Sequence, residues 1–97
     1  MKQTNITRSA KNKDCLIRIP GHCNFDESTT VHCHKNGGGM SMKSNDILGA
    51  RGCSGCHGVV DGAIKTEFSR DEVLIMLYEG IFRTQLQLID EGLVKIE

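Results

Sequence analysis

The clearest pattern of apolar and polar positions lies toward the C-terminal end of the chain. Seven residues there fall mainly on one face of a helix: Leu74, Leu77, Tyr78, Ile81, Gln85, Leu88 and Ile89. Ser69 and Glu72 have the spacing of a capping box, and Gly92 suits the position after a last helical turn. The pattern predicts a helix over about 70–91 that packs its apolar stripe on a core, with Gly80 as a soft spot or a close-packing point.

Shorter patterns upstream predict three strands and a second helix. Residues 15–19 resemble a short strand that ends in a Pro-Gly turn, and residues 29–34 are rich in β-branched side chains. A glycine-rich loop leads from there to another strand near residues 47–51. A short helix is expected over residues 54–61. Strands and helices in this order indicate the α+β class.

Length and composition fit a single small domain. The chain has 97 residues, with no Trp, one Tyr and three Phe, so its apolar core is modest. Residues 1–13 are polar and basic and are expected to form a disordered arm, and residues 14–97 one domain. There is no apolar run typical of a signal peptide and no stretch long enough to cross a membrane, so we expect a cytoplasmic, reducing location.

Cysteine spacing indicates a metal site. Cys53 and Cys56 form a CxxC knuckle, and the pair formed by Cys15 and Cys23 is spaced like a longer hairpin. Four thiolates close a tetrahedral shell around Zn²⁺, and such a structural ion contributes about 10–16 kcal/mol of apparent binding energy. We therefore expect zinc to be a condition of folding. Disulfides or free thiols are the less favoured alternatives, because paired cysteines in a reducing compartment more often bind metal.

Two residues near these pairs have open roles. His57 directly follows Cys56, and it would either be held beside the metal for other chemistry or, less favoured, replace one cysteine as a ligand. Cys33 is left over from the four, and we expect it to be a small buried apolar residue.

The charge is unevenly distributed. Residues 1–58 carry eight Lys and Arg against four acids, whereas residues 59–97 carry four against eight. The basic part, which contains every cysteine and histidine, suits a polyanion such as DNA or RNA, although charge alone favours an ordinary solvated surface. Three basic residues flank the histidines and are candidate phosphate contacts: Lys35, Lys43 and Arg51.

The order of these segments resembles the ββα-metal motif of HNH nucleases, with His34 ending one strand and His57 opening a helix. More specifically, the sequence resembles the YbcO-type family of small phage and prophage proteins described as nucleases. The resemblance covers about residues 15–96. It rests on CLIRIPGHC at 15–23, GGGMSMK at 37–43, NDI at 45–47, CSGCH at 53–57 with DG at 61–62, and EG at 79–80 with RTQ at 83–85.

The resemblance implies roles for individual residues. His34 would be the general base, which suits an imidazole because its usual pKa of about 6.5 lies near working pH. His57 would hold a catalytic ion together with Asp46, a carboxylate that suits a hard cation. Asp61 lies four residues after His57 on the same helical face and would orient its ring. Many HNH enzymes have a metal-binding Asp or His just before the base; here that residue is Cys33, so His32 is a candidate substitute ligand.

The resemblance therefore implies a phage- or prophage-encoded endonuclease that cleaves DNA, with RNA left open. It would use a structural Zn²⁺ and a catalytic Mg²⁺, Mn²⁺, Ni²⁺ or Zn²⁺. The main alternative is a non-catalytic zinc module that binds DNA or a phage or host protein. A c-type haem protein is a further alternative, because the CSGCH segment fits the CxxCH attachment motif. The outer side of the long helix leaves a homodimer open.

Overall fold

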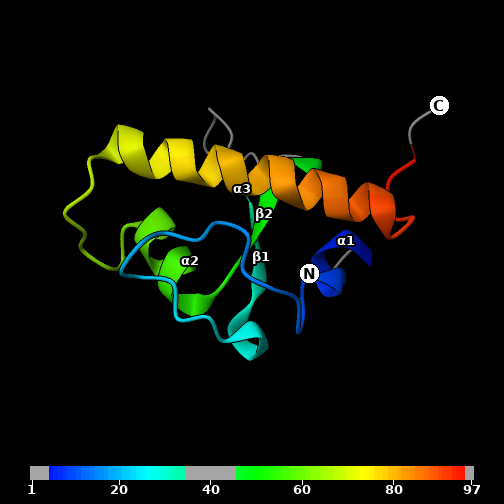
Figure 1. Cartoon of the computed structure of the whole chain (residues 1–97), viewed down its shortest axis with the longest axis horizontal. Helices are drawn as coiled ribbons and strands as arrows, with labels where there is room; N and C mark the ends of the chain where they lie inside the picture. Colours follow the sequence, from blue (N-terminus) through cyan, green and yellow to red (C-terminus); the bar gives the residue numbers. More distant parts are fainter. Residues whose placement is uncertain (1–4, 35–45, 96–97) are drawn as a thin grey trace.

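The computed structural model describes residues 5–34 and 46–95. Seven elements follow one another along this part of the chain: α1 (Asn5–Ser9), η1 (Glu27–Thr29), β1 (Val31–His34), η2 (Asp46–Leu48), β2 (Gly49–Gly52), α2 (Ser54–Asp61) and α3 (Arg70–Asp90). β1 and β2 form an antiparallel pair with Val31 opposite Gly52 and His34 opposite Gly49. In Figure 1, α3 runs along one side of the molecule, and α2, the strand pair and α1 lie in a row beneath it. The protein is a small mixed α/β domain.

The long helix α3 agrees with the prediction. The Ser69 hydroxyl accepts from the Glu72 amide while the Glu72 carboxylate accepts from the Ser69 amide, so the capping box is present. After the helix, Gly92 adopts φ +79°, and the amides of Gly92 and Leu93 donate to the carbonyls of Ile89 and Leu88. This is the hydrogen-bond pattern of a Schellman motif. The buried stripe of α3 consists of Val73, Leu77, Gly80, Ile81, Thr84 and Leu88.

The segment at residues 15–19 differs from the predicted strand. Its backbone is irregular, because Arg18 adopts φ +58°, a left-handed conformation that breaks the alternation of a strand. This bend allows Leu16, Ile17 and Ile19 all to be buried. A Cβ added to Gly80 would lie 3.0 Å from the Ile17 Cα, so Gly80 is a close-packing point between α3 and this segment.

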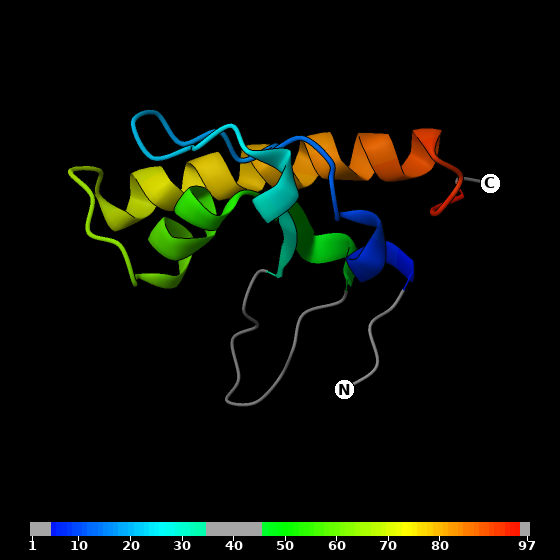
Figure 2. The same cartoon turned by 90° about the horizontal axis from the view of Figure 1, so that it is seen from below.

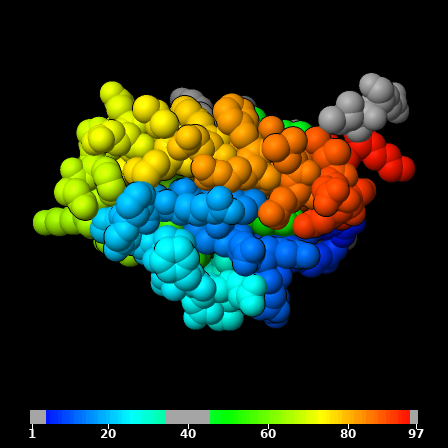
Figure 3. Space-filling view, viewed as in Figure 1, coloured from blue at the N-terminus to red at the C-terminus, as the bar shows by residue number. Residues whose placement is uncertain are grey.

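The N-terminal residues also differ from the expected disordered arm. The described part contains the short helix α1, and Ala10 after it is fully buried. In the space-filling view, the blue part of this N-terminal segment lies against α3, and the cyan part that follows lies farther from the helix (Figure 3). The sequence signal for this order is weak, because α1 contributes no buried residue of its own.

Arg51 anchors α1 from the strand β2. Its side chain is 0 % exposed, and it donates to Gln87 Oε1 (2.7 Å), to both carboxylate oxygens of Glu91 (2.7 and 2.8 Å) and to Ser9 Oγ (3.0 Å). We expected Arg51 to contact phosphate, and that assignment was wrong. A guanidinium enclosed by protein partners has no surface to offer a substrate, and the residue instead joins α1, β2 and the end of α3.

The outer face of α3 carries exposed apolar side chains, among them Ile75, Phe82 and Leu86. A homodimer through this face stays a prediction. Within residues 5–34 and 46–95, no helix combines the length and the apolar character needed to cross a membrane.

Candidate functional site: a cysteine cluster beside a histidine groove

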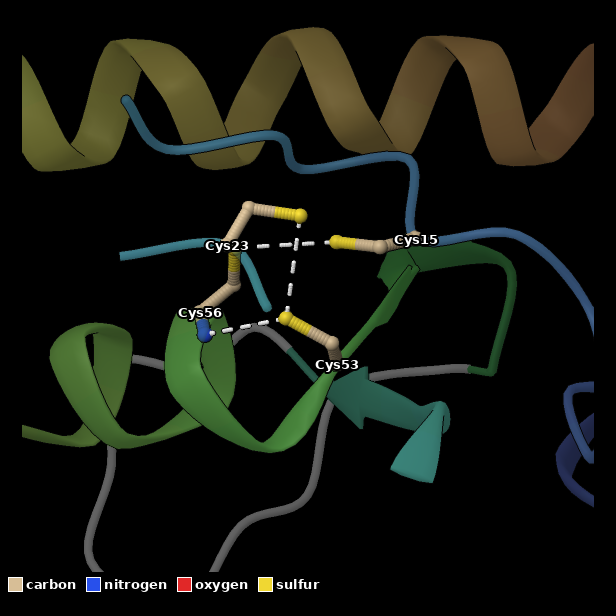
Figure 4. Close-up of side chains that lie close together, drawn as sticks. All are labelled: Cys15, Cys23, Cys53 and Cys56. Carbon is tan, nitrogen blue, oxygen red and sulfur yellow. Dashed lines mark hydrogen bonds between the residues drawn. The ribbon is translucent and has the colours of Figure 1, made fainter. Parts of the chain in front are cut away.

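Four cysteine side chains from three parts of the chain converge on one point. Cys15 and Cys23 come from the irregular segment before β1, Cys53 follows β2, and Cys56 lies in α2 (Figure 4). All four sulfur atoms lie within 4.8 Å of one another. The Cys15 and Cys56 sulfurs are 3.6 Å apart, and the Cys23 and Cys53 sulfurs 3.8 Å apart. This cluster could hold a metal ion, as the spacing predicted.

Backbone amides point at the sulfur atoms of the knuckle. The Cys53 sulfur accepts from the amides of Cys56 and Asn24, and the Cys56 sulfur accepts from the amide of Ile19, each at 3.4 Å. The Cys15 and Cys56 thiols share one hydrogen bond, which holds the pKa of Cys15 low, at about 4, and raises the pKa of Cys56. Donors aimed at sulfur favour the thiolate form, which is the form that binds metal.

The fifth cysteine lies apart from the cluster. Cys33 is 1 % exposed and packs in the apolar core, where burial raises the pKa of its thiol to about 12. The prediction of a small buried apolar residue is confirmed.

Three histidines line a groove of about 780 Å³ next to the knuckle. His32 and His34 alternate on β1, and their rings meet edge to face with centroids 4.9 Å apart, as expected for residues on one face of a strand. His57 lines the same groove from the first turn of α2. Seen from below the view of Figure 1, α2, the strand pair and α1 follow one another across the molecule (Figure 2).

Asp46 connects the two strand histidines. Its Oδ1 lies 2.7 Å from His34 Nε2, and its backbone carbonyl lies 2.6 Å from His32 Nε2. Because both oxygens are acceptors, each Nε2 carries the proton. When a ring is neutral, its second nitrogen, Nδ1, holds the lone pair. The sequence paired Asp46 with His57, whereas the structure places its carboxylate against His34.

His32 is the most enclosed of the three histidines. It is 7 % exposed, and burial lowers the pKa of its imidazole, which favours the neutral ring. Its Nδ1 has no hydrogen-bond partner among the described residues. The ring lies directly over Gly49 on β2, where any Cβ would overlap it. A buried nitrogen of this kind costs about 1–3 kcal/mol when unpaired, so His32 Nδ1 is a candidate ligand atom.

His57 is paired along its own helix. Its Nε2 lies 3.0 Å from Asp61 Oδ2, one turn later in α2. A carboxylate in this position fixes the ring orientation and leaves Nδ1 as the lone-pair nitrogen. His57 is not part of the four-sulfur cluster.

The other predicted residues lie elsewhere. Lys35 and Lys43 fall outside the described residues. His22 is not among the residues that line the groove, and its Nε2 lies 2.9 Å from Thr66 Oγ1. Two basic residues that line the groove, Arg8 and Lys11, were not predicted from the sequence. No sequence pattern indicated that residues 5–11 are ordered.

The fold and the site together define a small α/β domain with a four-cysteine knuckle beside a histidine-lined groove. The profile of the family described as "Putative nuclease YbcO" matches residues 4–93, and the chain belongs to this family.

Relatives with that description align with almost the whole chain. "Putative nuclease YbcO" of Escherichia coli K12 and "Putative nuclease ybcO" of Enterobacteria phage 82 are each 29% identical over 97 residues, covering 94% of this chain and 97% of the relative. A solved structure described as a putative bacteriophage protein from Escherichia coli K-12 MG1655 is 28% identical. It superimposes with a TM-score of 0.77 and covers 89% of this chain and 98% of its own.

Proposed function

We propose that this protein is a metal-dependent endonuclease that hydrolyses DNA, with β1, β2 and α2 forming an HNH-like ββα-metal motif. The observation that carries the proposal is the convergence of His32, His34 and His57 on one groove. The family description points to the same chemistry. A module that only binds nucleic acid has no need for a histidine base held by a carboxylate.

We propose zinc as the ion of the cysteine cluster. With Zn–S bonds of about 2.3 Å, the sulfurs of a tetrahedral site are separated by about 3.8 Å. The sulfur separations of 3.6 and 3.8 Å support this assignment. A closed shell of four thiolates leaves no position for substrate, so this ion would be structural. It also accounts for Cys15 and Cys23, which the haem alternative leaves without a role.

His34 is the proposed general base. With Nε2–H held by Asp46 at 2.7 Å, the ring presents Nδ1 to a water molecule in the groove. The water oxygen attacks the phosphorus atom, its proton passes to Nδ1, and the 3′-oxygen departs. The Asp46 carboxylate stabilises the imidazolium that forms, as the aspartate of a catalytic triad does. We therefore assign Asp46 a positioning role rather than metal binding.

The proposed ligands of the catalytic ion are the Nδ1 atoms of His57 and His32. Bound there, a divalent cation would polarise the phosphate and stabilise the departing oxygen. Asp61 orients the first ring, and the Asp46 carbonyl orients the second. Imidazole nitrogens suit Ni²⁺ and Zn²⁺ better than Mg²⁺, so we expect the softer cations to support cleavage best.

The test is cleavage of supercoiled plasmid DNA with Mg²⁺, Mn²⁺, Ni²⁺ or Zn²⁺ added to zinc-loaded protein. His34→Ala should abolish nicking while retaining the bound zinc and the wild-type circular dichroism spectrum. His22→Ala is the matched control, because it removes a histidine outside the groove and should leave nicking unchanged.

The same experiment separates the proposal from its alternative. Wild-type protein that binds DNA yet nicks it with none of the four metals would favour the non-catalytic module. Equal nicking by wild type and His34→Ala would mean that the activity comes from a contaminant.

A further inference from the structure

One wall of the histidine groove is formed by the N-terminal segment rather than by the strand pair or α2. Thr7, Arg8 and Lys11 line the groove together with His32 and His34 from β1 and His57 from α2. Among residues 5–34 and 46–95, those that line the groove include two fixed positive charges and no carboxylate. Within the described residues, neither Arg8 nor Lys11 takes part in an ion pair. Both cations are therefore available to an anion that enters the groove.

The position of this wall is fixed by contacts to the protein interior. The Ser9 hydroxyl accepts from the buried Arg51 guanidinium at 3.0 Å, and Ala10 is fully buried. Arg8 Nη2 donates to Asn5 Oδ1 at 2.7 Å, which holds the guanidinium along α1.

A tight turn then fixes Lys11. Successive hydrogen bonds join the Lys11 amide to the Arg8 carbonyl (3.3 Å) and the Lys13 amide to the Ala10 carbonyl (3.1 Å). Asn12 follows with φ +62°, a left-handed conformation that asparagine tolerates. The wall is thus pre-organised, so binding costs little ordering entropy.

We propose that Arg8 and Lys11 bind the phosphate backbone of duplex DNA beside the phosphate that faces the histidines. This inference rests on the proposed function and adds the site that positions the substrate. A groove lined both by cations and by the proposed general base suits a polyanion, because phosphates next to the scissile one can then neutralise the cations. The scissile phosphate then lies at the histidines.

The expected effect follows from counterion release. Each phosphate contact contributes about 0.9 to the slope of log K against log salt, which is about eightfold in affinity at 0.1 M salt. Arg8→Gln with Lys11→Gln should therefore weaken DNA binding by up to about 60-fold and lower the slope by nearly 2. Glutamine retains helix propensity and both side chains are exposed, so the fold should survive.

The experiment measures binding apart from cleavage. Zinc-loaded His34→Ala protein and a fluorescent 20-base-pair duplex are titrated by anisotropy at several salt concentrations. The matched control is Lys65→Gln with Lys95→Gln, which removes the same charge from exposed positions outside the groove lining. The charge-preserving pair Arg8→Lys with Lys11→Arg should retain both affinity and slope.

The outcomes distinguish this inference from the proposed function. Equal affinity and slope for the Gln pair and the Lys65/Lys95 control would overturn the phosphate-binding wall, whether or not wild type cuts DNA. If the Gln pair loses DNA affinity and wild type cleaves DNA with none of the metals, the phosphate-binding role of Arg8 and Lys11 is supported and the nuclease proposal is refuted. Tighter binding of a matched RNA duplex would overturn the assignment to DNA.

Discussion

The buried guanidinium of Arg51 gives the sharpest prediction about stability. Glu91→Ala removes the carboxylate that accepts two of its hydrogen bonds, at 2.7 and 2.8 Å. Breaking a buried ion pair by removing one partner costs about 3–5 kcal/mol. The Glu91 side chain is 28% exposed, so water takes over part of the carboxylate's role. We therefore expect a loss of about 2–3 kcal/mol, or about 10–20 °C in Tm for a domain of this size.

The assay is urea unfolding of zinc-loaded protein followed by circular dichroism. Glu79→Ala is the control, since it removes an exposed glutamate from the same helix and should change stability by no more than about 0.5 kcal/mol. In a double-mutant cycle with Arg51→Met, the coupling energy should be about 1–3 kcal/mol, because the methionine no longer needs the carboxylate. A Glu91→Ala variant as stable as Glu79→Ala would refute this reasoning.

The same ion pair predicts a pH dependence. Hydrogen bonds from Arg51 lower the pKa of Glu91 below its usual 4.5. A depressed carboxyl pKa means that the stabilisation is fully present above pH 4.5 and is lost as the pH falls through the folded-state pKa. The stability gap between wild type and Glu91→Ala should therefore narrow below pH 4.5. A stability difference between wild type and Glu91→Ala that stays constant down to pH 3 would contradict this prediction.

Two further predictions concern the knuckle. Cys56→Ser opens the four-thiolate shell, and we expect it to lose zinc in native mass spectrometry and to lose the cooperative melting transition; retention of both would contradict a structural ion. Gly55→Ala should weaken zinc binding despite a gain in helix propensity. The added Cβ would overlap the His22 carbonyl oxygen, in the segment that carries Cys15 and Cys23. Gly58→Ala, whose Cβ meets only the Ile64 side chain, should be milder, and equal zinc affinities for the two variants would count against the backbone clash.

Elements with strong local signals were predicted well from the sequence. The helix expected over residues 54–61 has those bounds, and the helix expected over about 70–91 spans residues 70–90. In both cases the ends are set by local chemistry, the capping box in the second and a left-handed glycine, Gly62, in the first. The cysteine cluster could also be predicted from the sequence, because the type and spacing of the ligands directly indicate a metal site.

Features that depend on tertiary contacts could not be predicted. The helix α1 is ordered by a buried arginine in β2, and the sequence gives no sign that an arginine so near the histidines points inward. The partner of Asp46 depends on how the chain enters β2, which no local pattern encodes. The irregular run at residues 15–19 follows from the close approach of Ile17 to Gly80, a contact across more than half the chain.

The network around Arg51 also constrains how the protein can be synthesised. The guanidinium enters the interior with β2, but its carboxylate partner is Glu91, forty residues later along the chain. A nascent chain on the ribosome has therefore made β2, the knuckle and all of α3 before it has made the carboxylate that neutralises this charge. Docking of α1 against Arg51 therefore gains its full set of contacts only after translation has passed Glu91.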